Sequence, residues 1–271
     1  MARRKRFGPI ATGLLVLGLI VVAVLALPQS LGYPSLVSWL KDRVMIPQDQ
    51  AFDRPRLATD LASAGFAMGN EVHLRIFKRE KRLEVWMRGD TAPYRMFRTY
   101  DICTFSGELG PKLREGDRQS PEGFYRIRLS QLNPDSRHHL AFNTGFPNEY
   151  DKQLGRTGSF LMVHGGCSSI GCYAMTDGGI DEIYAVVEAA LNRGQDGVDV
   201  AIFPFVMSEA ALAAEAQNTW HPFWTNLKHG FDLFETALMP PRVAACDGQY
   251  RFGADAGAPG CQPISGWQGA A

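Results

Sequence analysis

The sequence predicts a mainly β fold with a few peripheral helices, an α+β domain closer to a sandwich or barrel than to a βαβ fold. Two observations predict the strands: apolar and polar residues alternate in several runs between residues 71 and 129, and again over 198–202. A third observation limits the helices, because only the stretch after residue 177 has a long helical pattern. With 271 residues, 45% of them hydrophobic, the chain can bury a sizeable core.

The strands are expected in several separate runs. Alternation over 72–76 and 83–87, with the charged segment Lys78–Arg82 between them, predicts a hairpin with a charged tip. Further strands are expected over 94–104, 124–129, 160–163 and 198–202. The Gly- and Pro-rich segment 106–123 is predicted to be a long ordered loop. The aromatic segment 131–158 is predicted to be loop-rich and, at that length, functional.

Helices are expected at the periphery. The clearest covers 177–191, where Asp177 is the expected N-cap and the apolar residues fall on one face. Two short helices are expected over 208–217 and 220–228. In the proline-broken N-terminal connector only Leu36–Val44 could form a short helix.

The N-terminus carries a basic block, Arg3–Arg6, followed by the uncharged apolar segment 7–29. This pattern is typical of a cleaved signal peptide or of a retained membrane anchor, and both place the rest of the chain outside the cytoplasm. Val24-Leu25-Ala26 is a candidate cleavage site, whereas a run of about 20 apolar residues is also long enough to span a bilayer. The predicted organisation is a signal peptide or anchor over 1–27, a connector over 28–67, a main domain over 68–240 and a loose C-terminal tail over 241–271.

Charge and cysteine content narrow the class of protein. Lys+Arg and Asp+Glu both number 28, so no net positive field favours nucleic acid as a partner. Outside the cytoplasm disulfides are stable, and a Cys246–Cys261 bridge would restrain the tail by about 3 kcal/mol. Five cysteines leave at least one thiol free. Cys172 is expected to be that thiol, and whether Cys103 and Cys167 pair stays open.

The segment Phe160-Leu-Met-Val-His-Gly-Gly-Cys-Ser-Ser-Ile-Gly-Cys172 carries the candidate chemistry. An apolar strand delivers His164 into a glycine-broken loop that ends at Cys172, so the two residues are interpreted as general base and cysteine nucleophile. Gly171 permits a backbone angle that other residues resist, and amides around it could bind an oxyanion. Ser169 is expected to orient the loop or to donate a hydrogen bond.

No carboxylate lies in this segment, so a backbone carbonyl, of Gly165 or of a neighbouring loop, is expected to orient the His164 ring. Three other interpretations stay open: an inert loop with structural cysteines, a zinc site made by His164, Cys167 and Cys172, and a Cys167–Cys172 redox pair. His138 and His139 lie in a polar segment and are interpreted as solvated, with a substrate-lining role as the alternative.

Several motifs resemble the L,D-transpeptidase catalytic domain, the YkuD family, and most closely its YafK branch, which includes DpaA. The resemblance covers roughly residues 68–240. The matching segments are Ser106–Lys112, Glu115–Asp117, Ser120–Tyr125, Gln131–Ser136, Gly145–Asn148 and His164–Thr176. Two features depart from the general family pattern: Ile170 replaces the histidine of Ser/Thr-His-Gly-Cys, and the stretch from His164 to Cys172 is shorter. Both fit the YafK branch.

The resemblance implies a β-sandwich or barrel of the YkuD type, with Cys172 as nucleophile, His164 as base, Gly165, Ser169 and Gly171 in support, and no cofactor or metal. It implies a periplasmic enzyme that acts on peptidoglycan stem peptides at the L-centre of meso-diaminopimelate, through a thioester. The acceptor is an amine in transpeptidation and water in a DpaA-like reaction that releases a lipoprotein linked to peptidoglycan. An uncleaved N-terminal helix would add the inner membrane as a partner.

Overall fold

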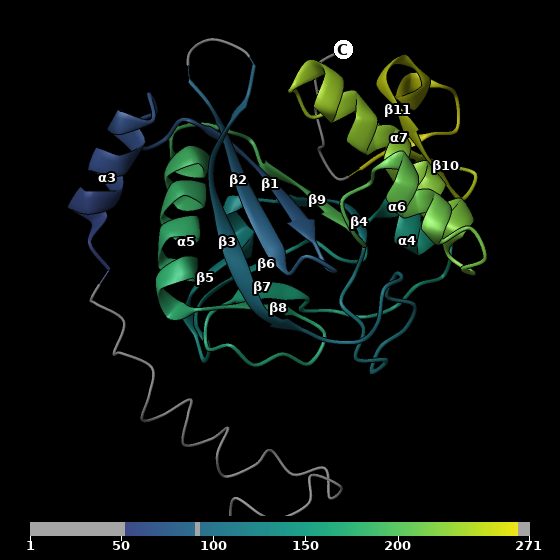
Figure 1. Ribbon diagram of the computed structural model, residues 1–271, viewed down its shortest axis with the longest axis horizontal. Helices are drawn as coiled ribbons and strands as arrows, with labels where there is room; N and C mark the ends of the chain where they lie inside the picture. The colour runs from purple at the N-terminus through teal and green to yellow at the C-terminus, as the bar shows by residue number, and fades with distance from the viewer. Residues whose placement is uncertain (1–51, 90–92, 265–271) are drawn as a thin grey trace, which may run out of the picture. The chain divides into compact units, whose positions relative to one another are not determined.

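A computed structural model describes residues 52–89 and 93–264 (Figure 1). The chain divides into two units, Met1–Gln50 and Ala51–Ala271. The first unit lies outside the described residues, and with it lie the predicted signal or anchor and the predicted helix Leu36–Val44. Within the described ranges, no helix is both long and apolar enough to cross a membrane.

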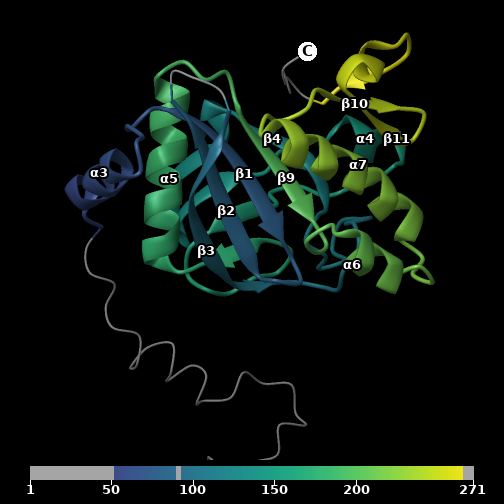
Figure 2. The same ribbon diagram turned by 45° about the horizontal axis from the view of Figure 1, so that its top comes forward.

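A nine-stranded sheet forms the centre of the second unit (Figures 1 and 2). Its strands lie in the order β4-β9-β1-β2-β3-β8-β7-β6-β5, and all neighbours are antiparallel except the pairs β1–β9 and β7–β8. The strand bounds are β1 Glu71–Phe77, β2 Arg82–Arg88, β3 Arg95–Phe105, β4 Gly123–Ile127, β5 Leu132–Ser136, β6 His139–Asn143, β7 Met162–His164, β8 Tyr173–Met175 and β9 Val198–Phe203.

Helices cover both faces of this sheet: α5 (Asp177–Asn192) lies along one face, while α6 (Glu209–Ala214) and α7 (His221–Ala237) lie beyond the other (Figure 2). The alternation of strand side chains explains this arrangement. On β9, Val200 and Ile202 join the core that contains α5, whereas Ala201 and Phe203 join the aromatic core under α7. Because both cores are apolar, the central strands are buried throughout.

The mainly β fold with peripheral helices is confirmed, and the expected strands form close to their predicted positions. Segment 131–158 is loop-rich and also contains β5, β6 and the short helix α4 (Glu149–Gln153). Two local predictions were wrong. Helix α3 (Arg54–Ser63), capped by Asp53, forms inside the expected connector because Leu57 and Leu61 bury against the main core. Helix α5 is capped by Thr176 rather than by Asp177.

The C-terminal residues differ from the loose tail that the sequence predicts. Strands β10 (Val243–Cys246), β11 (Gln249–Phe252) and β12 (Gln262–Pro263) form a second, three-stranded sheet. Tyr250 and Phe252 are buried in the aromatic core. This burial orders the segment, although its turn-rich composition predicts a loose tail.

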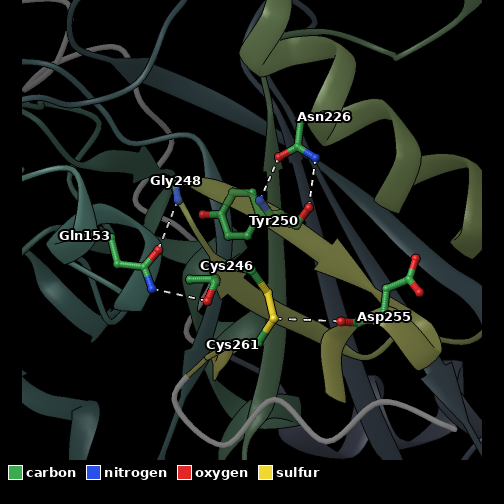
Figure 3. The surroundings of a disulfide bond; sticks show 8 residues. Gln153, Asn226, Cys246, Gly248, Tyr250, Asp255 and Cys261 are labelled. Carbon is green, nitrogen blue, oxygen red and sulfur yellow. Dashed lines mark hydrogen bonds between the residues drawn. A yellow bond between two sulfur atoms is a disulfide. The ribbon is translucent and has the colours of Figure 1, made fainter. Parts of the chain in front are cut away.

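Two side-chain amides on neighbouring helices form hydrogen bonds with the backbone of this second sheet (Figure 3). Asn226 of α7 both donates to and accepts from the backbone of Tyr250, at 3.0 and 2.9 Å, in the way a neighbouring strand would. Gln153 of α4 donates to the carbonyl of Ala245 and accepts from the amide of Gly248. The predicted Cys246–Cys261 disulfide is confirmed and closes the segment.

Candidate active site

Parallel pairing of β7 with β8 places the two candidate catalytic residues on one face of the sheet. Val163 pairs with Tyr173 and His164 with Ala174, so Cys172, one residue before β8, lies level with Met162. Val163 and Tyr173 point into the core that contains α5. The side chains of His164 and Cys172 are therefore expected on the opposite face, with Cys172 two residues before the β8 partner of His164.

The Cys172 thiol contacts the backbone before β7. It accepts a hydrogen bond from the Met162 amide, with N and Sγ 3.4 Å apart, and donates to the Phe160 carbonyl at 3.7 Å. Burial raises the pKa of the Cys172 thiol, and the Met162 amide and the positive charge of Lys112 partly oppose that rise. The Cys172 thiol is therefore protonated at neutral pH.

His164 is 3% exposed, and its ring orientation is set by the next residue. Its Nδ1 lies 2.6 Å from the Gly165 carbonyl oxygen, the contact expected from the sequence. Since a carbonyl only accepts, Nδ1 carries the proton and the unprotonated Nε2 is left as the proton acceptor. Burial lowers the pKa of His164 more than its bond to Gly165 raises it, so the imidazole is neutral. His164 and Cys172 both lie in the described range 93–264, and the structure shows no direct hydrogen bond between their side chains there.

The loop between His164 and Cys172 depends on its glycines. Gly171 has φ +99°, a region that favours glycine, immediately before the nucleophile. At Gly165, a Cβ atom would lie 2.6 Å from an Asp177 carboxylate oxygen and 3.0 Å from the His138 carbonyl. That Asp177 carboxylate accepts the Gly166 amide at 2.8 Å, so the residue expected to cap α5 instead holds the loop between His164 and Cys172.

Two serine hydroxyls hold the backbone of Cys172. Ser169 donates to the Cys172 carbonyl at 2.7 Å, and Ser120 donates to the same oxygen at 3.0 Å. Ser106 completes the arrangement, because its hydroxyl lies 3.0 Å from that of Ser169 and its amide donates to the Ser120 hydroxyl. Ser169 thus orients the loop, as expected, whereas Ser106 and Ser120 were not predicted for this role. They lie more than 50 residues before Cys172, and no local pattern pairs them with it.

A buried ion pair holds the loop that carries Ser106 and Ser120. The side chains of Lys78 and Glu122 are both 0% exposed, with the ammonium 3.0 Å from the carboxylate. The ammonium also donates to the carbonyls of Glu108, Gly110 and Ser120. The predicted hairpin tip forms between β1 and β2. The side chain of Lys78 nevertheless points inward, because the loop carbonyls replace its water.

A disulfide between Cys103 and Cys167 ties the catalytic loop to β3. This pairing was left open by the sequence, and with Cys246–Cys261 it leaves Cys172 as the free thiol. Cys167 is consequently unavailable as a zinc ligand or as a redox partner of Cys172. In the described ranges no cluster of three or more His, Cys, Asp or Glu residues could hold a metal ion.

The surroundings of the thiol contain two large exposed apolar side chains. Phe160 is 71% exposed and Ile170 is 82% exposed. Phe160, predicted to be part of a buried strand, precedes β7 and has φ +55°. Ile170, at the position of the family's second histidine, points to solvent and supplies no proton-transfer group.

Comparison with known proteins identifies the class to which this site belongs. A family model described as the L,D-transpeptidase catalytic domain, YkuD, matches residues 71–202. The chain belongs to this family. Over 183 residues it is 47% identical to the protein named "Putative L,D-transpeptidase YafK" of Escherichia coli K12, an alignment that covers 68% of this chain and 74% of that protein. The protein of the same name from Escherichia coli O157:H7 matches equally well.

Solved structures with lower identity also match. The helical cell shape determining protein Pgp2 of Campylobacter jejuni is 24% identical, with 55% of each chain covered and a TM-score of 0.39. Bd1075 of Bdellovibrio bacteriovorus is 15% identical over 68% of this chain and 84% of its own, with a TM-score of 0.38. L,D-transpeptidase 1 of Mycobacterium tuberculosis is 14% identical over 51% and 64%, with a TM-score of 0.27.

Proposed function

We propose that this protein is an exported cysteine acyl-transfer enzyme that acts on peptidoglycan stem peptides in the periplasm. The observation that carries the proposal is the strand pairing that brings the free thiol of Cys172 and the buried, carbonyl-oriented imidazole of His164 to one face. Membership of the L,D-transpeptidase family supports the substrate class. The basic and apolar N-terminal segment supports export or anchoring in the inner membrane.

In the proposed first half-reaction, Nε2 of His164 takes the Cys172 proton as sulfur attacks the carbonyl on the L-centre of meso-diaminopimelate. Amides near Gly171 and Cys172 stabilise the oxyanion of the tetrahedral intermediate. The C–N bond to the leaving group then breaks, and His164 returns the proton to the departing amine. The products are a thioester on Cys172 and a free amine. Proton transfer accompanies attack because both groups are neutral at rest.

In the second half-reaction an acceptor attacks the thioester carbonyl and His164 takes the acceptor's proton. The C–S bond then breaks, and His164 passes that proton to the sulfur, so the Cys172 thiol re-forms. An amine acceptor gives transpeptidation. Water gives hydrolysis, and the DpaA-like form of that reaction would release a lipoprotein from peptidoglycan. The exposed Ile170 stands where the general family has a histidine. Because this loop departs from the general family, both acceptors, amine and water, are to be tested. A wall-binding module with an inert thiol is the non-catalytic alternative.

The test incubates the purified full chain with muropeptides and, separately, with lipoprotein-linked muropeptide, and follows products by mass spectrometry. We expect a new cross-link or a cleaved product, and an acyl adduct on Cys172. Cys172→Ala and His164→Ala should abolish both, whereas His229→Ala, at an exposed histidine of α7, should not. Product formation unchanged in Cys172→Ala would refute the nucleophile. Binding to sacculi without any product would favour the wall-binding module.

A further inference from the structure

The tip of the β5–β6 hairpin places a second imidazole against the candidate base. His138 lies between the paired residues Ser136 and His139, on an exposed turn. Its ring centroid is 4.7 Å from that of His164, and the two rings are inclined by 31°. A side chain from a separate hairpin therefore covers one face of the His164 ring.

This turn is fixed on both sides, so the contact between the rings is built into the fold. The His138 carbonyl accepts the Gly165 amide at 3.0 Å, next to the carbonyl that orients His164. The neighbouring His139 has Nε2 2.7 Å from the Asp181 carboxylate of α5. His139 adopts φ +66°, a left-handed conformation that costs energy in a non-glycine residue and persists only where surrounding contacts enforce it.

The charged and titratable groups around His164 come from four elements. The β5–β6 turn contributes His138, and α5 contributes Asp177, bound to the Gly166 amide, and Asp181, paired with His139. The segment before β8 contributes the Cys172 thiol, and loop 106–122 contributes Lys112, whose charge acts on that thiol. Of these groups, His138 makes the ring contact, and a positive charge on it opposes a positive charge on His164.

We propose that His138 is a positioning residue of this site, which holds the His164 ring toward Cys172 and keeps it in the neutral, proton-accepting form. The inference rests on the proposed function for its catalytic meaning, but the ring contact can be tested without substrate. Loss of the covering ring admits water to His164, and hydration favours the imidazolium. Replacement by phenylalanine keeps an aromatic ring at this position but removes the imidazole.

The experiment compares wild type, His138→Ala and His138→Phe in the full chain, purified in detergent. Selective ¹³C labelling of histidine follows the titration of His164, and iodoacetamide follows the reactivity of Cys172, the free thiol. We expect His164 to titrate at higher pH in His138→Ala than in wild type, with His138→Phe in between. With muropeptide substrate, kcat should fall at least tenfold in His138→Ala with KM within twofold, and His138→Phe should recover part of it.

His229→Phe is the matched control, because His229 is an exposed histidine that packs on Phe252 with ring centroids 5.1 Å apart. It should leave the titration of His164 and kcat unchanged. A wild-type titration of His164 in His138→Ala overturns the inference. So does an equal rise of KM in the alanine and phenylalanine variants, which would make His138 a substrate contact. If wild type forms no product, the proposed function fails, while the titration still decides the role of His138.

Discussion

At Cys172 the backbone and the side chain are restrained by separate sets of contacts. The carbonyl is held by the hydroxyls of Ser120 and Ser169, while the sulfur contacts the amide of Met162 and the carbonyl of Phe160. In the proposed reaction, a thiol fixed in this way would lose little freedom on meeting a substrate carbonyl. The two serines differ in burial, and this difference can be tested.

Ser120→Ala should destabilise the protein by about 1–3 kcal/mol, because it leaves the Ser106 amide without its acceptor and removes one donor to Cys172. Ser169→Ala should cost less, since Ser120 still serves the Cys172 carbonyl. Urea unfolding measures both free energies. The double variant should lose more than the sum of the two, because the carbonyl then loses both hydroxyls. Strict additivity would contradict the shared-acceptor arrangement.

His73 should make the fold sensitive to acid. Burial lowers its pKa to about 3 from 6.5, so between these values the unfolded chain binds a proton that the folded chain does not. The contribution of neutral, buried His73 to the free energy of unfolding is therefore complete above pH 6.5, and it is lost as the pH falls toward 3. From pH 7 to pH 4, wild type should lose roughly 3 kcal/mol more than His73→Leu in urea unfolding. The exposed-site variant His229→Leu should keep the wild-type slope. A parallel slope in His73→Leu would contradict this assignment.

At the scale of elements, loop 106–122 lies against the site through Ser106 and Ser120, which contact Ser169 and the Cys172 carbonyl. It has no regular secondary structure, so its carbonyls need other donors, and Lys78 supplies three hydrogen bonds to them. Glu122 balances that charge and also accepts the Gly110 amide and the Trp224 indole. The loop is thereby held by side-chain contacts in place of the hydrogen bonds of a strand or a helix.

Glu122→Gln should destabilise the protein by about 3–5 kcal/mol, because it leaves the fully buried Lys78 ammonium without a counter-charge. Lys78→Met/Glu122→Gln should cost less than the sum of the single changes. The matched control is Glu188→Gln, which breaks the exposed Arg54–Glu188 pair and should change the free energy of unfolding by less than about 1 kcal/mol. Equal effects of Glu122→Gln and Glu188→Gln in urea unfolding would contradict the role given to the buried pair.

The two disulfides should separate stability from activity. Cys103–Cys167 spans 64 residues and Cys246–Cys261 spans 15, so loop-closure entropy predicts losses of about 4 and about 3 kcal/mol when each is replaced by alanine. Only Cys167 lies between His164 and Cys172. We therefore expect Cys103→Ala/Cys167→Ala to lower product formation at temperatures where it remains folded, and Cys246→Ala/Cys261→Ala to leave it unchanged. Equal loss of activity in both would assign the effect to stability alone.

At the scale of the whole second unit, one sheet separates two cores, and the C-terminal sheet completes the second of them. Removal of residues 241–271 should abolish cooperative folding. Each large buried side chain lost removes about 1.5–3 kcal/mol, and Val243, Tyr250, Phe252 and Ile264 are lost together, against a typical total of about 5–15 kcal/mol. Thermal unfolding by circular dichroism measures this. Gln262→Ala, at an exposed residue of β12, is the control, and a truncated chain with wild-type cooperativity would contradict the prediction.

Much of the fold and the centre of the candidate site could be predicted. Alternation over 72–76 predicts β1, because successive side chains of a strand point to opposite faces. This period of two can be read from neighbouring residues alone. The Gly165 carbonyl next to His164 could be predicted for the same reason, as it lies one residue away. Lys78, Ser120 and His138 could not be placed, because their partners lie 26 to 52 residues away and their own neighbourhoods are polar.

The sequence by itself determined the class of fold, the family, and the histidine and cysteine of the candidate site, since all of these follow from local periodicity and one contiguous motif. Only the tertiary structure decided that Cys103 pairs with Cys167, that Lys78 is buried, that the C-terminal segment packs, and that His138 covers His164. The physical reason is distance along the chain. Contacts within a few residues are constrained by backbone geometry, whereas contacts between distant segments depend on how the sheet brings them together.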